Sequence, residues 1–246
     1  MPPKNIKLNC DMGESLSALN MGLDEQIMPY IDMANLACGF HAGDPVTMHQ
    51  CIKSAKANAV SIGAHPSYPD IEGFGRREMQ CSAEEIVSFI IYQCGALDAL
   101  CQSYGTKISY VKPHGALYNT MMKEMEVFKA IVKAVSKYDK NIKLMILSTT
   151  DNANYAEVAD KYGIDLLYEI FADRAYQDNG HLVPRSQEGA VLSSTEEILK
   201  RAELLQEKGI IESINGKPLA LRSDTLCVHG DNEHALSIIQ ALHELK

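Results

Sequence analysis

Seven short apolar runs alternate with longer helical patterns along the 246-residue chain, and this alternation limits its fold more than any other feature. Neighbouring strands joined by helical crossovers are parallel, so the sequence predicts an α/β protein with one parallel sheet. We expect strands at 6–11, 33–38, 60–65, 108–114, 143–149, 165–172 and 225–230. The spacing of apolar residues predicts helices near 24–31, 45–59, 82–104, 116–138, 152–162, 194–208 and 232–245.

Capping sequences support several of these boundaries. Ser82 and Glu85 have the spacing of a capping box, in which each residue satisfies a backbone N–H of the first helical turn. Asp44 and Pro45 supply an N-cap followed by a favoured first helical residue. An Asn-Gly pair within 209–224 predicts an additional β-hairpin before the last strand.

Two architectures fit the alternation, an open doubly wound sheet and a closed (β/α) barrel. We favour a seven-stranded, TIM-like barrel because the predicted strands carry polar residues at one common end. No linker, repeat or low-complexity segment divides the sequence. Since α/β barrels of about 250 residues occur as single units, we expect residues 1–246 to form one domain.

The composition argues against several classes of partner. A formal net charge of −9 disfavours nucleic-acid binding, which needs clustered Lys and Arg. The N-terminus lacks the apolar core of a signal peptide, and no run approaches the roughly 18 apolar residues of a membrane helix. The seven cysteines form no CxxC pair and lie largely in apolar runs, which is typical of reduced, buried thiols. We therefore expect a cytoplasmic protein.

Polar side chains gather where the predicted strands end. In α/β barrels the catalytic groups come from the carboxyl ends of different strands, where the following loops converge. A single histidine at such a position is more often structural, but convergence of many polar groups predicts an active site. The residues at or just past the strand ends are Asp11, Glu14, His41, Asp44, His65, Lys112, His114, Glu169, Asp173, Arg174, His229 and Asp231.

Two long polar loops add candidate anion-binding groups. The loop at 63–77 ends in Arg76 and Arg77, and the loop at 171–186 contains Arg174 and Arg185. Long ordered loops in a compact domain are usually functional. Guanidinium groups bind carboxylates and phosphates in bidentate fashion, so these arginines are candidates for holding an anionic substrate.

Seven blocks of the sequence resemble the successive signature blocks of the LamB/YcsF family. They are "LNCDMGES", "NLACGFHAGDP", "IGAHPSYPDIEGFGRR", "VKPHGALYN", "FADRAY", "LVPRS" and "DTLCVHGD", and they run from about residue 6 to 232. The segment 15–26 departs from the family pattern, since relatives usually carry an aromatic residue and a glycine there. The resemblance implies a barrel related to the glycoside hydrolase/deacetylase superfamily. It also implies ATP-dependent hydrolysis of 5-oxo-L-proline to L-glutamate, performed with two partner subunits, B and C.

The resemblance suggests how the chemistry is divided. The chain has no GxxxxGK[ST] phosphate loop, so we expect ATP, with its Mg²⁺, to bind mainly to the partner subunits. Asp11 or His41 would then act as general base, and His65 or His114 would protonate the leaving ring nitrogen. The expected catalytic residues are Asp11, Glu14, His41, His65 and His114, and the expected substrate- or anion-binding residues are Lys112, Arg76, Arg77, Asp173, Arg174, Arg185 and His229.

Two other functions remain open from the sequence. The first is a metal-dependent hydrolase or deacetylase acting on a small amide or carbohydrate. Its Zn²⁺ or Mn²⁺ would be held by Asp11, His41, His65, His114 and His229. The second is a non-catalytic role in binding or assembly, although several titratable groups at one barrel mouth argue against it.

Overall fold

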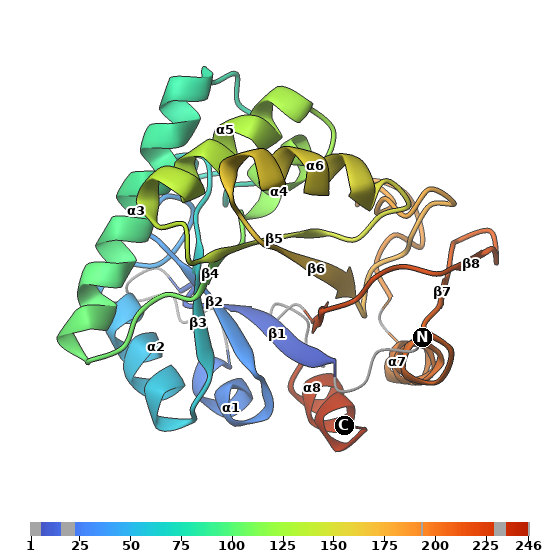
Figure 1. The fold of residues 1–246 in the computed structure, drawn as a ribbon. Coiled ribbons are helices and arrows are strands. Elements are labelled where there is room, and N and C mark those ends of the chain that lie inside the picture. Colours follow the sequence, from blue (N-terminus) through green and yellow to red (C-terminus); the bar gives the residue numbers. More distant parts are fainter. Residues whose placement is uncertain (1–5, 16–22, 193, 229–234, 246) are drawn as a thin grey trace.

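The computed structural model describes residues 6–15, 23–192, 194–228 and 235–245, and its centre is a closed barrel of seven parallel strands (Figure 1). Around the barrel the strand order is β1-β2-β3-β4-β5-β6-β9, and β9 pairs with both β6 and β1 to close it. The barrel prediction is therefore confirmed, and the open sheet is excluded. The strands are β1 (Lys7–Met12), β2 (Met33–Ala37), β3 (Ser61–His65), β4 (Tyr110–Val111), β5 (Lys143–Leu147), β6 (Leu166–Phe171) and β9 (Thr225–Cys227).

The helices surround the strands, as Figure 1 shows. The predicted helix over 116–138 is wrong in one respect, because the chain forms two helices there. Glu124 adopts extended backbone (φ −118°, ψ 106°), which separates them. The helix expected at 24–31 also divides, since Pro29 lacks an N–H and lies in a 3₁₀ turn at Met28–Tyr30. The α-helices are α1 (Asp24–Ile27), α2 (Pro45–Ala57), α3 (Ala83–Ser103), α4 (Gly115–Met121), α5 (Met125–Tyr138), α6 (Asn152–Tyr162), α7 (Thr195–Lys208) and α8 (Ala235–Glu244).

The predicted caps and hairpin are present. The Asp44 side chain accepts hydrogen bonds from the backbone N–H groups of Val46 and Thr47 at the start of α2. Ser82 and Glu85 form the capping box of α3. The Asn-Gly hairpin consists of two short antiparallel strands, β7 (Ile211–Glu212) and β8 (Pro218–Leu219).

Helix α3 contradicts the expectation that no segment of the sequence approaches a membrane helix in length and apolar character. Among the described helices, it reaches the length and mean hydropathy, 1.3, of a possible membrane span by composition alone. In the structure it is an outer helix of the barrel that packs against α5 and β3. Its buried residues include Ile86, Ile90 and Leu97, as expected for the apolar side of a helix that covers a core.

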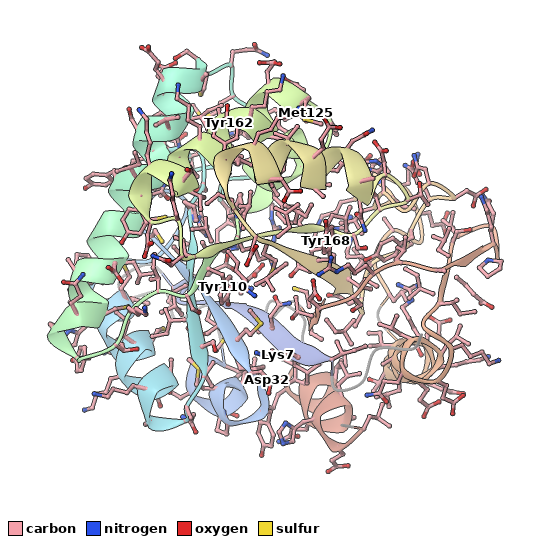
Figure 2. The ribbon with its side chains drawn as sticks, viewed as in Figure 1. Lys7, Asp32, Tyr110, Met125, Tyr162 and Tyr168 are labelled. Carbon is pink, nitrogen blue, oxygen red and sulfur yellow. The ribbon has the colours of Figure 1, made fainter. Side chains whose placement is uncertain are left out.

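Polar side chains fill the middle of the barrel. The Tyr110 hydroxyl donates to Asn35 Oδ1 at 2.7 Å, and Asn35 Nδ2 donates to Asn9 Oδ1 at 2.8 Å. Asn9 Nδ2 in turn donates to the hydroxyl of Thr225 at 2.8 Å. Figure 2 labels Tyr110 where β2, β3 and β4 overlap in the view. This chain of hydrogen bonds satisfies buried polar groups and provides a rigid base under the carboxyl ends of the strands.

Gly63 makes room for this network, and this leads to a prediction for stability. A Cβ atom on Gly63 would lie 2.1 Å from the Tyr110 ring, so Gly63→Ala must displace the ring or the backbone of β3. We expect a loss of about 3 kcal/mol in the free energy of unfolding, at the upper end for overpacked cores. Urea unfolding followed by circular dichroism measures it.

Gly95 is the matched control for this experiment. It lies within α3, and apart from the adjacent residues and backbone of its own helix nothing described lies within 4 Å of an added Cβ. Gly95→Ala should therefore leave stability unchanged or raise it by up to about 1 kcal/mol, the helix-propensity difference. Equal effects of the two substitutions would contradict the steric argument for Gly63.

Candidate active site

A cavity of about 570 Å³ opens at the carboxyl ends of the barrel strands. Most of the residues that the sequence singled out line this cavity. Asp11 comes from β1, His65 from the end of β3, Lys112 and His114 from the segment after β4, and Glu14 from the loop after β1. Three of the four arginines of the two long loops lie on its wall, and they are Arg76, Arg174 and Arg185.

Lys112 forms the floor of the site. Its Nζ lies 2.8 Å from Asp11 Oδ1 and 2.9 Å from Glu169 Oε1, and its side chain is 3% exposed. Burial opposes the charge, but the neighbouring carboxylates of Asp11 and Glu169 raise the pKa of Lys112 well above its usual value. The ammonium group is therefore already paired with two carboxylates. This geometry favours a role in positioning Asp11 over direct binding of a substrate anion.

Asp11 is held in one orientation by donors on its Oδ1 atom. That oxygen accepts from Lys112 Nζ and from Asn35 Nδ2, both at 2.8 Å. The second oxygen, Oδ2, lies 3.4 Å from His65 Nε2. Since Asp11 lines the cavity, its carboxylate is placed where it can meet a substrate or a water molecule.

His65 and His114 each have one ring nitrogen hydrogen-bonded to a backbone carbonyl. Their two other ring nitrogens face each other. His65 Nδ1 lies 2.7 Å from the carbonyl oxygen of Lys112, and His114 Nε2 lies 2.9 Å from the carbonyl oxygen of Phe74. A carbonyl only accepts, so both of these nitrogens carry the proton of the neutral ring. The other two nitrogens, His65 Nε2 and His114 Nδ1, are 3.0 Å apart. Neutral His65 and His114 thus have no N–H directed at the cavity.

His41 and Glu14 complete this cluster. His41 Nε2 lies 3.1 Å from Glu14 Oε1, and His114 Nδ1 lies 3.3 Å from the same oxygen. The His41 and His114 rings are stacked, with centroids 3.7 Å apart and planes within 3°. Burial, together with the neighbouring His65, lowers the pKa of His41 well below its usual value. His41 is completely buried and does not line the cavity.

The loop that begins at His65 holds the two stacked rings in place. Gly75 has a left-handed backbone (φ +64°), and an added Cβ would lie 2.7 Å from His114 Cδ2 and 2.8 Å from His41 Cβ. Its carbonyl oxygen accepts from the N–H of Ala116 at 2.8 Å at the start of α4. Only glycine allows this close approach without strain. The glycine-rich loop therefore presses directly on the histidine cluster.

Positive charge lines the outer wall of the cavity. The buried Arg174 guanidinium donates to the carbonyl oxygens of Val183 at 2.8 Å and Ala190 at 3.2 Å. Burial and repulsion from Arg185 and Arg76 lower the pKa of Arg174 to about 10. It therefore remains charged at neutral pH. A wall of this kind suits an anionic group such as a carboxylate or phosphate.

Besides His41, two described residues among the predicted site residues, Arg77 and Asp173, do not line the cavity. Arg77 forms an ion pair with Asp70 and does not line the cavity, so it stabilises its own loop. Asp173 is 2% exposed and also lies outside the cavity lining. His229 lies outside the described residues, as does the neighbouring Asp231.

Two further residues, Glu169 and Tyr118, belong to the site, although the sequence alone did not suggest a role for them. Glu169 lies within the strand expected at 165–172, but its pairing with Lys112 is visible only in the closed barrel. Tyr118 lies on α4 and donates its hydroxyl to Glu169 Oε2 at 2.9 Å. Two sequence signals could have suggested it: its position about one turn after His114, the N-cap of α4, and its place in the "VKPHGALYN" block.

Comparison with known proteins agrees with this architecture. The sequence profile of the LamB/YcsF family matches residues 6–246. The 5-oxoprolinase A subunit of Vibrio cholerae serotype O1 is 52% identical over 239 residues, which cover 97% of this chain and 96% of that protein. The 5-oxoprolinase A subunit of Vibrio campbellii is 50% identical over 241 residues, covering 98% and 95%. The crystal structure of a lactam utilization protein from Thermus thermophilus matches with a TM-score of 0.91 at 40% identity, covering 98% of this chain and 95% of that one. The chain therefore belongs to the LamB/YcsF family.

Proposed function

We propose that this chain is the hydrolytic component of an ATP-dependent 5-oxoprolinase, which opens the lactam ring of 5-oxo-L-proline to give L-glutamate. The observation that carries the proposal is the Asp11 carboxylate, fixed by Lys112 at the floor of a cavity with an arginine-lined wall. A carboxylate suits proton transfer, and the arginines suit an anionic substrate. The names of the curated relatives supply the substrate.

A lactam is a poor electrophile, so the proposal divides the reaction between subunits. ATP phosphorylates the lactam oxygen on the partner subunits B and C, because the sequence of this chain has no phosphate-loop motif. Water then adds to the activated ring carbon in the cavity of this chain. The ring C–N bond breaks, the nitrogen leaves as the amine of γ-glutamyl phosphate, and a second water converts this acyl phosphate to glutamate and phosphate.

Asp11 is the base in this scheme. His41, the other candidate, is fully buried and does not line the cavity, whereas Asp11 does. Asp11 takes a proton from the attacking water and returns it to the ring nitrogen as that nitrogen leaves. We assign both transfers to Asp11 because the neutral His65 and His114 rings direct their N–H groups at backbone carbonyls. Arg76, Arg174 and Arg185 would hold the carboxylate and the phosphoryl group of the substrate.

A cytoplasmic location belongs to the same proposal. The structure describes all seven cysteines, and each is a free thiol. Burial, with the nearby Lys112 opposing it, raises the pKa of the Cys227 thiol well above its usual value. An uncharged, reduced thiol next to the active site fits a reducing compartment.

Reconstitution tests the proposed function. Glutamate release from 5-oxoproline should require ATP, this chain and both partner subunits, and this chain alone should release none. The assay measures glutamate and ADP in the same reaction, with each component omitted in turn. Turnover by this chain alone would overturn the division of labour, and full turnover without this chain would overturn the proposal.

A further inference from the structure

We infer that Glu14, His41, His65 and His114 form a binding site for one divalent transition-metal ion. These four residues each offer one ligand atom, and the four atoms lie within 4.8 Å of one another. The inference goes beyond the proposed function, because the proposed reaction scheme uses no such ion. Binding of the ion can also be measured without partners, ATP or turnover.

The distances between the ligand atoms fit a metal ion. Metal–ligand bonds of about 2.0–2.1 Å place tetrahedral ligand atoms about 3.4 Å apart. Glu14 Oε1 lies 3.1 Å from His41 Nε2 and 3.3 Å from His114 Nδ1. His65 Nε2 lies 3.0 Å from His114 Nδ1. Three of the separations are therefore close to the tetrahedral value, and all of them lie within 4.8 Å.

The proton positions point to the same conclusion. The carbonyl oxygens of Lys112 and Phe74 hold the protons of His65 and His114 on the outer side of the rings. The lone pairs of the two inner nitrogens then face each other and repel. Only a proton or a cation between them removes this repulsion. One proton would serve two of the four groups, whereas one metal ion would be shared by Glu14, His65 and His114, and by His41 once its ring tilts out of the stack with His114. Histidines that ligate metals usually donate their outer N–H to a carbonyl or carboxylate in this way.

The donor set selects the class of ion. Three imidazoles and one carboxylate suit Zn²⁺ and similar transition ions, whereas Mg²⁺ prefers oxygen ligands. His41 differs from the other two rings, because its Nδ1 is buried without a hydrogen-bond partner among the described residues. We therefore expect His41 to contribute less to affinity than His65 or His114.

A competition titration tests the inference. The full chain, stripped of metal with a chelator and dialysed, is titrated with Zn²⁺ against a chromophoric chelator, with Mg²⁺ as the comparison ion. We expect one equivalent of Zn²⁺ to bind tightly and Mg²⁺ not to compete. Loss of a group that merely orients a metal ligand costs about 10–100-fold in affinity, so removing two ligands in His65→Gln with His114→Gln should cost at least ~100-fold. His41→Gln should have a smaller effect.

The matched control is His243→Gln, an exposed histidine on α8. It should bind Zn²⁺ as the wild type does. A second readout uses the wild type alone, whose unfolding temperature should rise with Zn²⁺ because the ion binds the folded state. The inference is overturned if the wild type binds no stoichiometric Zn²⁺, if the paired substitution binds as tightly as the wild type, or if Mg²⁺ competes equally. Failure here would leave the reconstitution assay of the proposed function unaffected.

Discussion

Asp11→Asn is expected to lower the kcat of ATP-dependent glutamate release by about 10²–10⁴-fold, the usual contribution of a general base. Asparagine has nearly the same size and can still accept a hydrogen bond from Lys112 or Asn35, but it cannot take a proton from water. Lys112 keeps its pairing with Glu169, so the floor of the site should remain intact. Initial rates of glutamate release by the reconstituted enzyme measure the effect.

Two controls separate chemistry from assembly. Asp160→Asn changes an exposed aspartate on α6, far along the chain from the site, and should leave turnover unchanged. Copurification with the two partner subunits should be the same for Asp11→Asn as for the wild type. Lost turnover with retained partner binding would exclude a purely structural role for this chain. Unchanged turnover in Asp11→Asn would remove Asp11 from the mechanism.

The barrel could be predicted because its signals are local. Each strand and helix carries its own pattern of apolar residues, and caps such as Ser82 with Glu85 mark the helix starts. The rule that catalytic groups lie at the carboxyl ends of barrel strands then brought Asp11, His65 and His114 together without any structural information. These residues come from β1, the end of β3 and the segment after β4.

The remaining features depend on where side chains point. Arg76 and Arg77 are neighbours, yet Arg76 lines the cavity and Arg77 turns to Asp70 within its loop. Strand β4 is only Tyr110–Val111, shorter than the expected 108–114, and Pro113 just beyond it has no N–H for the sheet. The break between α4 and α5 has no Gly or Pro to announce it, since the intervening residues are Met122, Lys123 and Glu124.

The sequence around Lys112 does not show which groups pair with its ammonium group. A lysine at a strand end beside arginines suggests an anion-binding group. In the barrel, however, β6 places Glu169 opposite it, and the polar layer of Asn9 and Asn35 surrounds the same point. The positive charge of Lys112 is therefore paired within the protein, and Arg76, Arg174 and Arg185 on the cavity wall remain the proposed anion-binding groups.

Lys112→Met is expected to lower the free energy of unfolding by about 3–5 kcal/mol, the usual cost of removing one partner from a buried ion pair. Methionine fills much of the same volume, but it leaves the carboxylates of Asp11 and Glu169 close together without a cation. Glu169 is fully buried, so water cannot replace the lost interaction. Urea unfolding at neutral pH measures the change.

A second substitution tests whether the effect is electrostatic. Glu169→Gln in the Lys112→Met background removes the buried charge while leaving an amide oxygen that can accept from the Tyr118 hydroxyl. If the uncompensated carboxylate causes the loss, the double variant should be more stable than Lys112→Met alone. Glu169→Gln alone should be less harmful than Lys112→Met, because Lys112 still pairs with Asp11. A double variant no more stable than Lys112→Met would instead assign the cost to the packing of the lysine side chain.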